Sequence, residues 1–371
     1  MSFIIRTILE RWTWTYEPLP QSITQNPTKN STRKRLLALP AGLAVVGVVY
    51  LLWWITSAKA PYSPLDNYQN INANPILGAR PVASPSSRNH TAVVSTLYTD
   101  SYAIGVAVLG HSVRSANMTS RLILPYLARR VSPHALCIVT AAGWEPQSIQ
   151  FIPPPHHGKG VHQRFKDQYT KLNIWTFDQL GIEKLVYLDA DTLVLKNFDE
   201  LFEMPFNFAA VPDVYEPGDR RGFTISFNAG VLAIQPSSAV FKDMREKIET
   251  ARFPPVEAEQ SFLNHYYGAK GVRLPYAYNM NLAIKKRSLE LWENLKEEGK
   301  IVHYTLFKPF KGLSRRVSTR VEEEEAIRDA ATQDGGFFAE EFGWWKSAYE
   351  RLMADKGEEI ERCRPARGRS W

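Results

Sequence analysis

The chain has 371 residues, of which 44% are hydrophobic, and its 45 basic and 38 acidic residues give a formal net charge of +7. This length and apolar content allow one large globular domain or two smaller ones. The basic residues occur in short clusters, without a basic helix or interleaved aromatic residues, which argues against a nucleic-acid partner.

Residues 36–58 include 22 consecutive uncharged positions, "LLALPAGLAVVGVVYLLWWITS". A helix that crosses a bilayer needs roughly 20 apolar residues, so we expect a single transmembrane signal-anchor helix here. Trp53 and Trp54 suit the interface between membrane and water. A cleaved signal peptide fits less well, because the segment is long and begins far from the N-terminus.

The charges on the two sides of this segment predict its orientation. The basic cluster 33–35 precedes it, whereas a single lysine, Lys59, follows it closely. The positive-inside rule therefore predicts a cytosolic tail over 1–35 and places the rest of the chain in the lumen of the Golgi or the endoplasmic reticulum. This is a single-pass, type II arrangement.

The segment 59–89 is rich in proline, asparagine and serine and lacks periodicity, which predicts a stem. Glycosylation sequons at Asn89 and Asn117 follow the predicted membrane helix, and their use is left open. The two cysteines lie in an apolar run (Cys137) and in a charged tail (Cys363). We expect Cys137 to be a small buried hydrophobe and Cys363 to be an exposed thiol.

Strand and helix patterns alternate over 90–312, which predicts an α/β domain with a mostly parallel sheet covered on both faces. A C-terminal helical extension and a basic tail follow over 313–371. Residues 134–142 fit either a strand or a helix. The other predicted strands are 91–98, 148–152, 184–188, 206–211 and 230–235, and the predicted helices are 102–116, 164–180, 238–251 and 259–268.

Two acids, Asp189 and Asp191, follow the most apolar predicted strand, 184–188. In parallel α/β sheets, ligands collect beyond the carboxyl ends of the strands. The i, i+2 spacing lets both carboxylates approach one hard cation. The alternative is a turn in which the carboxylates bond only to the local backbone. This stretch alone leaves both open.

Further motifs accompany this pair in order along the chain: "TLYTDSYAIGVAVLGHSVR" (96–114), "KLNIW" (171–175), "FNAGVLAIQPS" (227–237) and "EQSFLN" (259–264). Together with "LVYLDADTLVLKNFDELF" they resemble glycosyltransferase family 8, the group of glycogenins and galactinol synthases. The resemblance implies a nucleotide-diphospho-sugar transferase domain of the GT-A type, in which "DAD" is the DxD motif.

The resemblance also implies a metal centre. Asp189, Asp191 and His303 would hold Mn²⁺, or Mg²⁺, that bridges the two phosphates of a UDP-sugar donor. The alternative for His303 is a histidine at a strand end that is satisfied within the core. In the loop after it, Leu306 stands where the family has glycine, and Phe310 where it has tryptophan.

Contacts to the donor are implied in the same way. Glu259 and Gln260 would face the anomeric carbon and Lys171 would lie near the phosphates, so these three are the catalytic candidates. The alternatives are an exposed first-turn acid for Glu259 and a solvated helix lysine for Lys171. The substrate-binding candidates are Leu97, Thr99, Tyr102, Arg164, Ala190, Asn228, Gly230 and Lys308.

The resemblance and the predicted anchor together imply a Mn²⁺-dependent, retaining enzyme. It would move a hexosyl or N-acetylhexosaminyl group from a UDP-sugar to a glycan, glycolipid or polyol. The alternatives are a glycogenin-like primer that glucosylates itself and a non-catalytic, glycan-binding scaffold. A metal-dependent phosphohydrolase would need more carboxylates or histidines around the pair than the sequence offers. The oligomeric state is left open, a homo-oligomer included.

Overall fold

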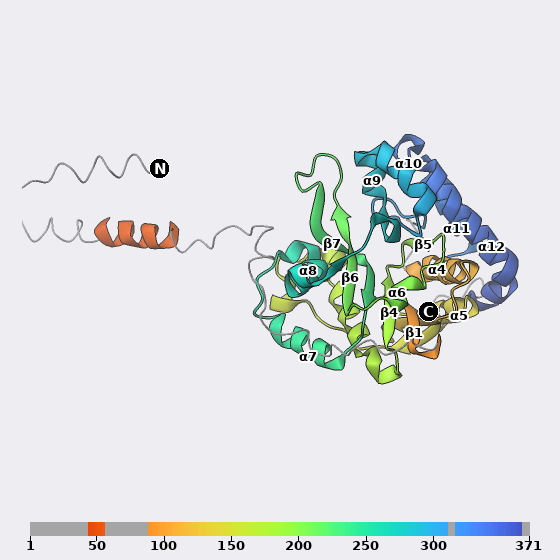
Figure 1. Ribbon diagram of the computed structural model, residues 1–371, viewed down its shortest axis with the longest axis horizontal. Coiled ribbons are helices and arrows are strands. Elements are labelled where there is room, and N and C mark those ends of the chain that lie inside the picture. The colour runs from red at the N-terminus through yellow and green to blue at the C-terminus, as the bar shows by residue number, and fades with distance from the viewer. Residues whose placement is uncertain (1–43, 56–87, 311–315, 366–371) are drawn as a thin grey trace, which may run out of the picture. The chain divides into compact units, whose positions relative to one another are not determined.

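A computed structural model describes residues 44–55, 88–310 and 316–365 of the chain (Figure 1). The chain divides into two units, Met1–Pro61 and Tyr62–Trp371. In the first unit, residues 44–55 form a helix whose apolar side chains are exposed.

The predicted membrane segment 36–58 is described only in part. Its residues 44–55 form the helix just mentioned. The other residues of the segment, the predicted tail 1–35 and nearly all of the predicted stem 59–89 lie outside the described residues. Within the described ranges, no helix is long and apolar enough to cross a membrane.

The second unit is built on a seven-stranded sheet in which most neighbouring strands are parallel. One strand, from Phe223 to Ile234, runs antiparallel to both of its neighbours. The predicted α/β architecture with a mostly parallel sheet is therefore confirmed. In spatial order the strands are β3 (Glu145–Ser148), β2 (Arg121–Tyr126), β1 (Thr91–Val94), β4 (Lys184–Leu188), β7 (Phe223–Ile234), β6 (Phe208–Val214) and β8 (Val272–Arg273).

A second, three-stranded sheet lies where the chain leaves β4. Its strands, in spatial order, are β5 (Thr192–Val194), β10 (Ile301–His303) and β9 (Met280–Asn281). β10 pairs antiparallel with β5 and parallel with β9, so His303 has Thr192 on one side and Asn281 on the other. This small sheet joins the end of the large sheet to a segment about a hundred residues further along the chain.

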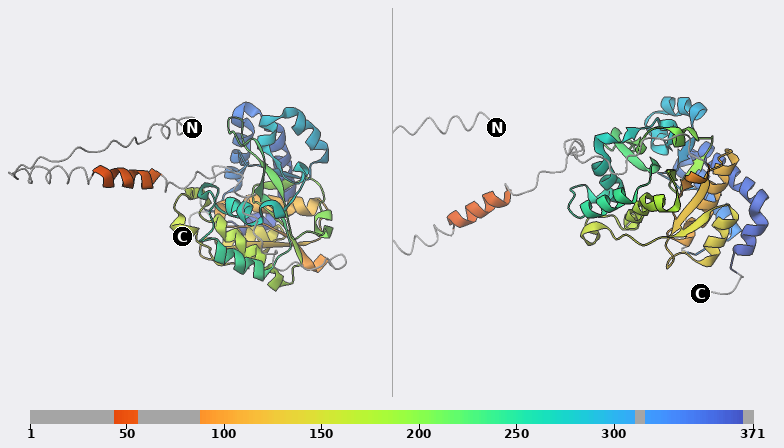
Figure 2. Two further views of the ribbon diagram at one scale, coloured as in Figure 1. Left: turned by 60° about the vertical axis from the view of Figure 1, so that its left-hand side comes forward. Right: turned by 60° about the horizontal axis from the view of Figure 1, so that its bottom comes forward.

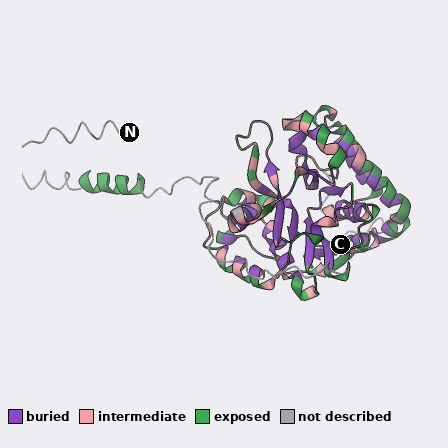
Figure 3. Cartoon of the chain, in the orientation of Figure 1, coloured by how far each residue is buried: buried purple, intermediate pink, exposed green. Residues whose placement is uncertain are grey.

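Helices cover the large sheet on both faces, as the views in Figure 2 show. Successive residues of β1 alternate between two buried clusters: Val93 packs on one side of the sheet, and Ala92 and Val94 pack on the other. The central strands β1 and β4 are fully buried between these layers (Figure 3), whereas β3 at the edge of the sheet is mostly exposed. The cluster that contains Val93 includes residues of α4 (Ala103–Ser115), α5 (Pro133–Ala141), α9 (Leu282–Arg287), α10 (Leu289–Glu298), α11 (Arg320–Thr332) and α12 (Ala339–Cys363). The cluster on the other side includes residues of α7 (Ser238–Lys247) and α8 (Ala258–Tyr267). The short helix α6 (Glu200–Glu203) follows β5.

Three expectations from the sequence differ from the structure. The predicted strand 148–152 is wrong, because β3 ends at Ser148 and the four residues that follow are not in a strand. The predicted helix 164–180 is a run of 3₁₀ turns, η5 (Gln168–Leu180). β2 has no counterpart among the predicted strands, because it contains Pro125 and proline disfavours the interior of a strand. The predicted strand 184–188 coincides with β4, the other predicted elements are present with shifted ends, and the ambiguous stretch 134–142 is helical, as α5.

The two cysteines form a disulfide, which corrects both expectations: Cys363 is not an exposed thiol, and Cys137 is exposed rather than a buried hydrophobe. Cys137 lies in α5 and Cys363 ends α12, and their Cα atoms are 5.4 Å apart. Cys363 is only 5% exposed. The two residues are separated by 226 positions, so no local pattern in the sequence indicates that α12 returns to α5. The bond ties the C-terminal extension to the body of the domain.

Cys363→Ser is expected to lower the free energy of unfolding by about 2–4 kcal/mol, because the cross-link restricts the unfolded chain over a long loop. Urea denaturation followed by tryptophan fluorescence measures the change. A reducing agent should destabilise the wild-type protein by a similar amount and leave the variant unaffected. Equal stability of the two oxidised proteins would contradict the pairing.

Candidate active site

Asp189 and Asp191 lie where the buried strand β4 leaves the large sheet and β5 begins. Thr192 closes the turn between the strands: its backbone N–H and its hydroxyl donate to the backbone oxygen of Asp189 over 3.0 and 2.8 Å. In the described part of the chain, neither carboxylate accepts a hydrogen bond from the backbone. The turn does not use the carboxylates, which argues against the pair as turn-capping residues.

His303 brings a ring nitrogen to both carboxylates. Its Nε2 lies 3.4 Å from an oxygen of Asp191 and 3.9 Å from an oxygen of Asp189. One ligand atom from each of the three residues lies within 4.8 Å of the other two. The structure therefore brings the predicted metal ligands together, two from the end of β4 and one from β10.

Asn279 determines how the ring of His303 is presented. Nδ1 lies 3.0 Å from the side-chain oxygen of Asn279, while the amide nitrogen of Asn279 donates to Asn228. Because the side-chain oxygen of Asn279 accepts from Nδ1, Nε2 is the ring nitrogen that faces the two carboxylates. Two carboxylates and an imidazole that face one another in this way fit a divalent cation such as Mn²⁺ or Mg²⁺. The arrangement argues against a His303 that serves only the core.

Gly230 leaves room for this ring. A Cβ atom added at Gly230 would lie 2.7 Å from Nδ1 of His303 and 2.8 Å from the side-chain oxygen of Asn228. The backbone oxygen of Gly230 also accepts a hydrogen bond of 2.8 Å from the N–H of Asp189. The close approach of His303 thus requires glycine at this position.

Gly230→Ala is expected to displace His303 and to weaken Mn²⁺ binding by about 10–100-fold, the usual effect of losing a group that orients a metal ligand. A Mn²⁺ titration monitored by electron paramagnetic resonance measures the affinity. Gly343→Ala in α12 is the matched control, because nothing lies within 4 Å of the added carbon. Wild-type affinity in the Gly230 variant would show that His303 is not a ligand.

Lys308 supplies positive charge beside the ligand oxygens. Its ammonium forms an ion pair with the carboxylate of Asp191. Burial opposes ionisation of Asp191, but Lys308 and His303 outweigh it and lower the pKa of this carboxyl well below its ordinary value. Asp191 is therefore ionised, as a metal ligand must be.

Lys171 is 1% exposed, which excludes a solvated helix lysine. Its ammonium donates to Glu259 over 2.8 Å and to the backbone oxygen of Ala229 over 3.1 Å, and it lies 3.2 Å from Asp189. Burial disfavours the charge, but the carboxylates of Asp189 and Glu259 outweigh it and raise the pKa of Lys171. Glu259 is itself buried, so it is not an exposed first-turn acid. Lys171 links the metal centre to Glu259.

Asp213, at the end of β6, is a buried carboxylate of the site that was not among the predicted residues. It accepts hydrogen bonds from the amides of Asn228 (3.2 Å), Gln260 (2.8 Å) and Asn281 (3.3 Å). Burial raises the pKa of Asp213. The available signal was its position two residues after the predicted strand 206–211. These four residues, here called the Asp213 cluster, offer several donors and acceptors to a polar ligand.

The three substrate-binding candidates near the end of β1 lie in different surroundings. Leu97 is fully buried, and its backbone N–H and oxygen are both used in hydrogen bonds, so the structure does not bring it into the site. Thr99 lies in the turn that follows. Tyr102 precedes α4 and packs edge-to-face on Phe310, with ring centroids 5.2 Å apart.

Two further candidates remain. Ala190, between the two acids, is buried. Arg164 is exposed, and its guanidinium lies over the ring of Phe165, 4.5 Å from the ring centre. In the described part of the chain Arg164 forms no ion pair with the carboxylates of the metal centre.

With this geometry established, comparison with known sequences identifies the family. The model of the family described as "Glycosyl transferase family 8" matches residues 93–312. The chain belongs to this family. The resemblance noted in the sequence and the expectation of a glycosyltransferase are thereby confirmed.

The relatives of this family 8 chain include a protein named as a glucuronosyltransferase and one named as a galactinol synthase. It is 35% identical to inositol phosphorylceramide glucuronosyltransferase 1 of Arabidopsis thaliana over 183 residues, which are 49% of this chain and 31% of that protein. It is 31% identical to galactinol synthase 1 of Solanum lycopersicum over 221 residues, 55% of this chain and 67% of that protein. The solved apo-form of the glycosyltransferase GlyE of Streptococcus pneumoniae TIGR4 matches with a TM-score of 0.45 and 18% identity, over 71% of this chain and 63% of that one.

In this family 8 chain, the C-terminal extension packs behind the loop that follows His303. Phe310 packs on Trp345 of α12 with ring centroids 6.0 Å apart. The hydroxyl of Tyr304 donates to the backbone oxygen of Glu341 in α12 over 2.6 Å. The family match ends before α12 begins, so these contacts come from outside the matched region.

Proposed function

We propose that this chain is a metal-dependent glycosyltransferase that moves a hexosyl or N-acetylhexosaminyl group from a UDP-sugar to a carbohydrate-type acceptor, with retention of configuration. The observation that carries this proposal is the convergence of Asp189, Asp191 and His303, with Lys308 beside them, in a chain of family 8. A divalent cation at these ligands, Mn²⁺ or Mg²⁺, supplies positive charge against the diphosphate of the donor.

The polar residues next to the metal centre suit the sugar of the donor. Gln260 is held at both ends: its side-chain oxygen accepts from the N–H of Ala229 over 3.0 Å, and its nitrogen donates to Asp213. Lys171 holds Glu259 in the same way. Groups that are oriented before the substrate binds are those that contribute most to catalysis. We assign Glu259 and Gln260 to the side of the anomeric carbon, and the Asp213 cluster to the sugar hydroxyls.

The proposed acceptor is a glycan, a glycolipid or a polyol. One relative is named for inositol phosphorylceramide, a lipid that carries a polyol. Because the chain spans about a third of the length of that relative, the name supports the class of acceptor and not a particular compound.

We further propose a type II orientation in the Golgi or endoplasmic reticulum membrane, with the catalytic domain in the lumen. The apolar segment 36–58 and its basic N-terminal flank support this orientation. The disulfide Cys137–Cys363 supports it independently, because disulfides persist in oxidising compartments. Protease treatment of sealed microsomes should leave the C-terminal body intact until detergent is added. Digestion without detergent would overturn the orientation.

A panel of UDP-sugars tests the proposed reaction. The full chain, purified in detergent with Mn²⁺, should release UDP from at least one of UDP-glucose, UDP-galactose, UDP-glucuronate and UDP-N-acetylglucosamine. Chelation of the metal should stop the release, and added Mn²⁺ should restore it. If folded, Mn²⁺-supplied protein releases no UDP from any donor, the proposal is wrong.

A further inference from the structure

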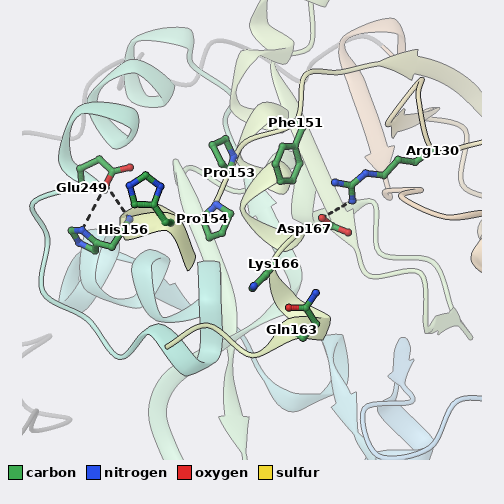
Figure 4. A pocket seen from close by; sticks show the side chains of 10 residues that line it. Arg130, Phe151, Pro153, Pro154, His156, Gln163, Lys166, Asp167 and Glu249 are labelled. Carbon is green, nitrogen blue, oxygen red and sulfur yellow. Dashed lines mark hydrogen bonds and ion pairs between the residues drawn. The ribbon is translucent and has the colours of Figure 1, made fainter. Parts of the chain in front are cut away.

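A cavity of about 870 Å³ lies at the carboxyl ends of β2 and β3, apart from the metal ligands (Figure 4). Arg130 comes from the segment after β2, and Phe151 from the segment after β3. None of the residues assigned to the donor lines the cavity. Because ligands of α/β proteins collect at this edge of the sheet, the cavity is a candidate for a second substrate.

The two acids that line the cavity, Asp167 and Glu249, each have a hydrogen-bond or ion-pair partner, whereas Lys166 has none within the described residues. Asp167 forms an ion pair with Arg130 over 2.6 Å, and Glu249 accepts a hydrogen bond of 3.3 Å from the backbone N–H of His156. Figure 4 shows these two pairs on opposite sides of the cavity, with Lys166 between them. The ammonium of Lys166 has no hydrogen bond or ion pair within the described residues. The cavity therefore holds a positive charge available to a ligand.

The loop that carries Lys166 is strongly basic. Residues 155–166, "PHHGKGVHQRFK", contain six lysine, arginine and histidine residues and no acid. Packing holds this loop in place: Gly160 lies against Pro255, where an added Cβ would be 2.8 Å from the proline ring, and Val161 is buried. The basic side chains are thus presented from a packed backbone.

The basic loop adjoins the donor side of the site. Lys166 stands five positions before Lys171, and at a rise of roughly 2 Å per residue in 3₁₀ turns this separation is about 10 Å along the backbone. Lys171 in turn contacts Asp189 and Glu259, so the segment that carries Lys166 leads directly into the donor side of the site. The cavity is therefore adjacent along the chain to a residue assigned to the donor.

We propose that this cavity binds the phosphate group of an acceptor that contains a phosphorylated polyol, with Lys166 as the cation that meets the phosphate; this rests on the glycosyltransferase function proposed above. A phosphate ester gives Lys166 the charged partner that it lacks, whereas a neutral sugar would leave the ammonium unpaired. The apolar side chains of Phe151, Pro153 and Pro154 line the same cavity and suit the uncharged remainder of such a ligand.

Calorimetric titration of the full chain in detergent, with UDP and Mn²⁺ present, tests this proposal with two soluble probes. myo-Inositol 1-phosphate should bind at least about tenfold more tightly than myo-inositol, because charge-assisted hydrogen bonds are stronger than neutral ones. Lys166→Gln should remove this preference, and Lys166→Arg should retain it. Lys159→Gln is the matched control, since Lys159 belongs to the same loop but does not line the cavity.

Equal binding of the two probes to the wild-type protein would overturn the proposal, and so would a preference that survives Lys166→Gln. Phosphatidylinositol in mixed micelles separates two sources of the phosphate: tighter binding than that of the soluble probe assigns a lipid acceptor, and equal binding assigns a soluble one. UDP release by the same preparations keeps the two proposals apart. Absent probe binding with normal UDP release rejects the cavity alone, whereas absent UDP release rejects the proposed function.

Discussion

Asp191→Asn is expected to abolish the metal-dependent release of UDP from UDP-sugars, with kcat reduced by at least about 100-fold, the usual cost of losing one pre-organised electrostatic group. Asparagine keeps the shape of the side chain but removes its negative charge. In the wild-type protein the carboxylate of Asp191 is ionised, because the effects of Lys308 and His303 outweigh that of burial and keep its pKa low. Without it, the remaining carboxylate and imidazole bind a divalent cation more weakly. A coupled assay for released UDP, run over a range of Mn²⁺ concentrations, measures the loss.

Asp199→Asn is the matched control for this variant. It makes the same chemical change in the same stretch of chain, but the carboxylate of Asp199 bonds to Asn197 and not to the metal ligands. UDP release and its dependence on Mn²⁺ should therefore equal those of the wild type. Activity of Asp191→Asn within a few-fold of the wild type would show that Asp191 does not hold the metal.

The largest loss of stability is expected for Glu341→Ala, at about 3–5 kcal/mol, because it leaves a buried cation without its partner. Glu341 is fully buried in α12. Its carboxylate accepts hydrogen bonds from Lys285 over 2.8 and 2.9 Å and from the indole N–H of Trp292 over 2.8 Å. Alanine leaves both donors unpaired in the core. The midpoint and slope of urea denaturation give the change in the free energy of unfolding.

Glu340→Ala tests whether this loss is specific. Glu340 is the neighbour of Glu341 on the same helix, but it is exposed and pairs with Lys296 at the surface. An exposed ion pair contributes at most about 1 kcal/mol, so this control should remain close to the wild type. A similar loss in both variants would mean that the buried pair of Lys285 and Glu341 has no special weight.

The two carboxylates of the metal centre were the part of the site that the sequence predicted best, because the pattern that indicates them spans only a few residues. The apolar strand 184–188 is followed at once by Asp189 and Asp191, so strand, turn and carboxylates lie within a few residues. His303 lies far along the chain and was found only through the resemblance to family 8. The structure explains how it arrives, since β10 pairs with β5 directly after the two acids.

Asn279 and Asn281 were not selected because their roles depend on contacts between distant segments. Asn279 directly precedes β9 and Asn281 ends it; this strand of only two residues is too short to leave a period-two pattern in the sequence. One orients His303 and the other contacts Asp213. Neither contact is visible until the small sheet is formed.

Local sequence patterns also did not predict which of the polar and cysteine side chains are buried. Without the resemblance to family 8, the local pattern at Lys171 fits a solvated helix lysine, yet Lys171 lies in the core between Asp189 and Glu259. Cys363 looked exposed within a charged tail, yet α12 returns it to Cys137. In both cases the partner is distant in sequence, and a helical pattern shows which residues share a face but not what covers that face.

The most direct test of the metal centre is anomalous diffraction from crystals grown with Mn²⁺ and UDP. We predict one strong manganese peak within coordination distance of the carboxylates of Asp189 and Asp191 and of Nε2 of His303, with the diphosphate on the side of Lys308. A manganese peak elsewhere, or UDP bound without any peak at these three residues, would contradict the account.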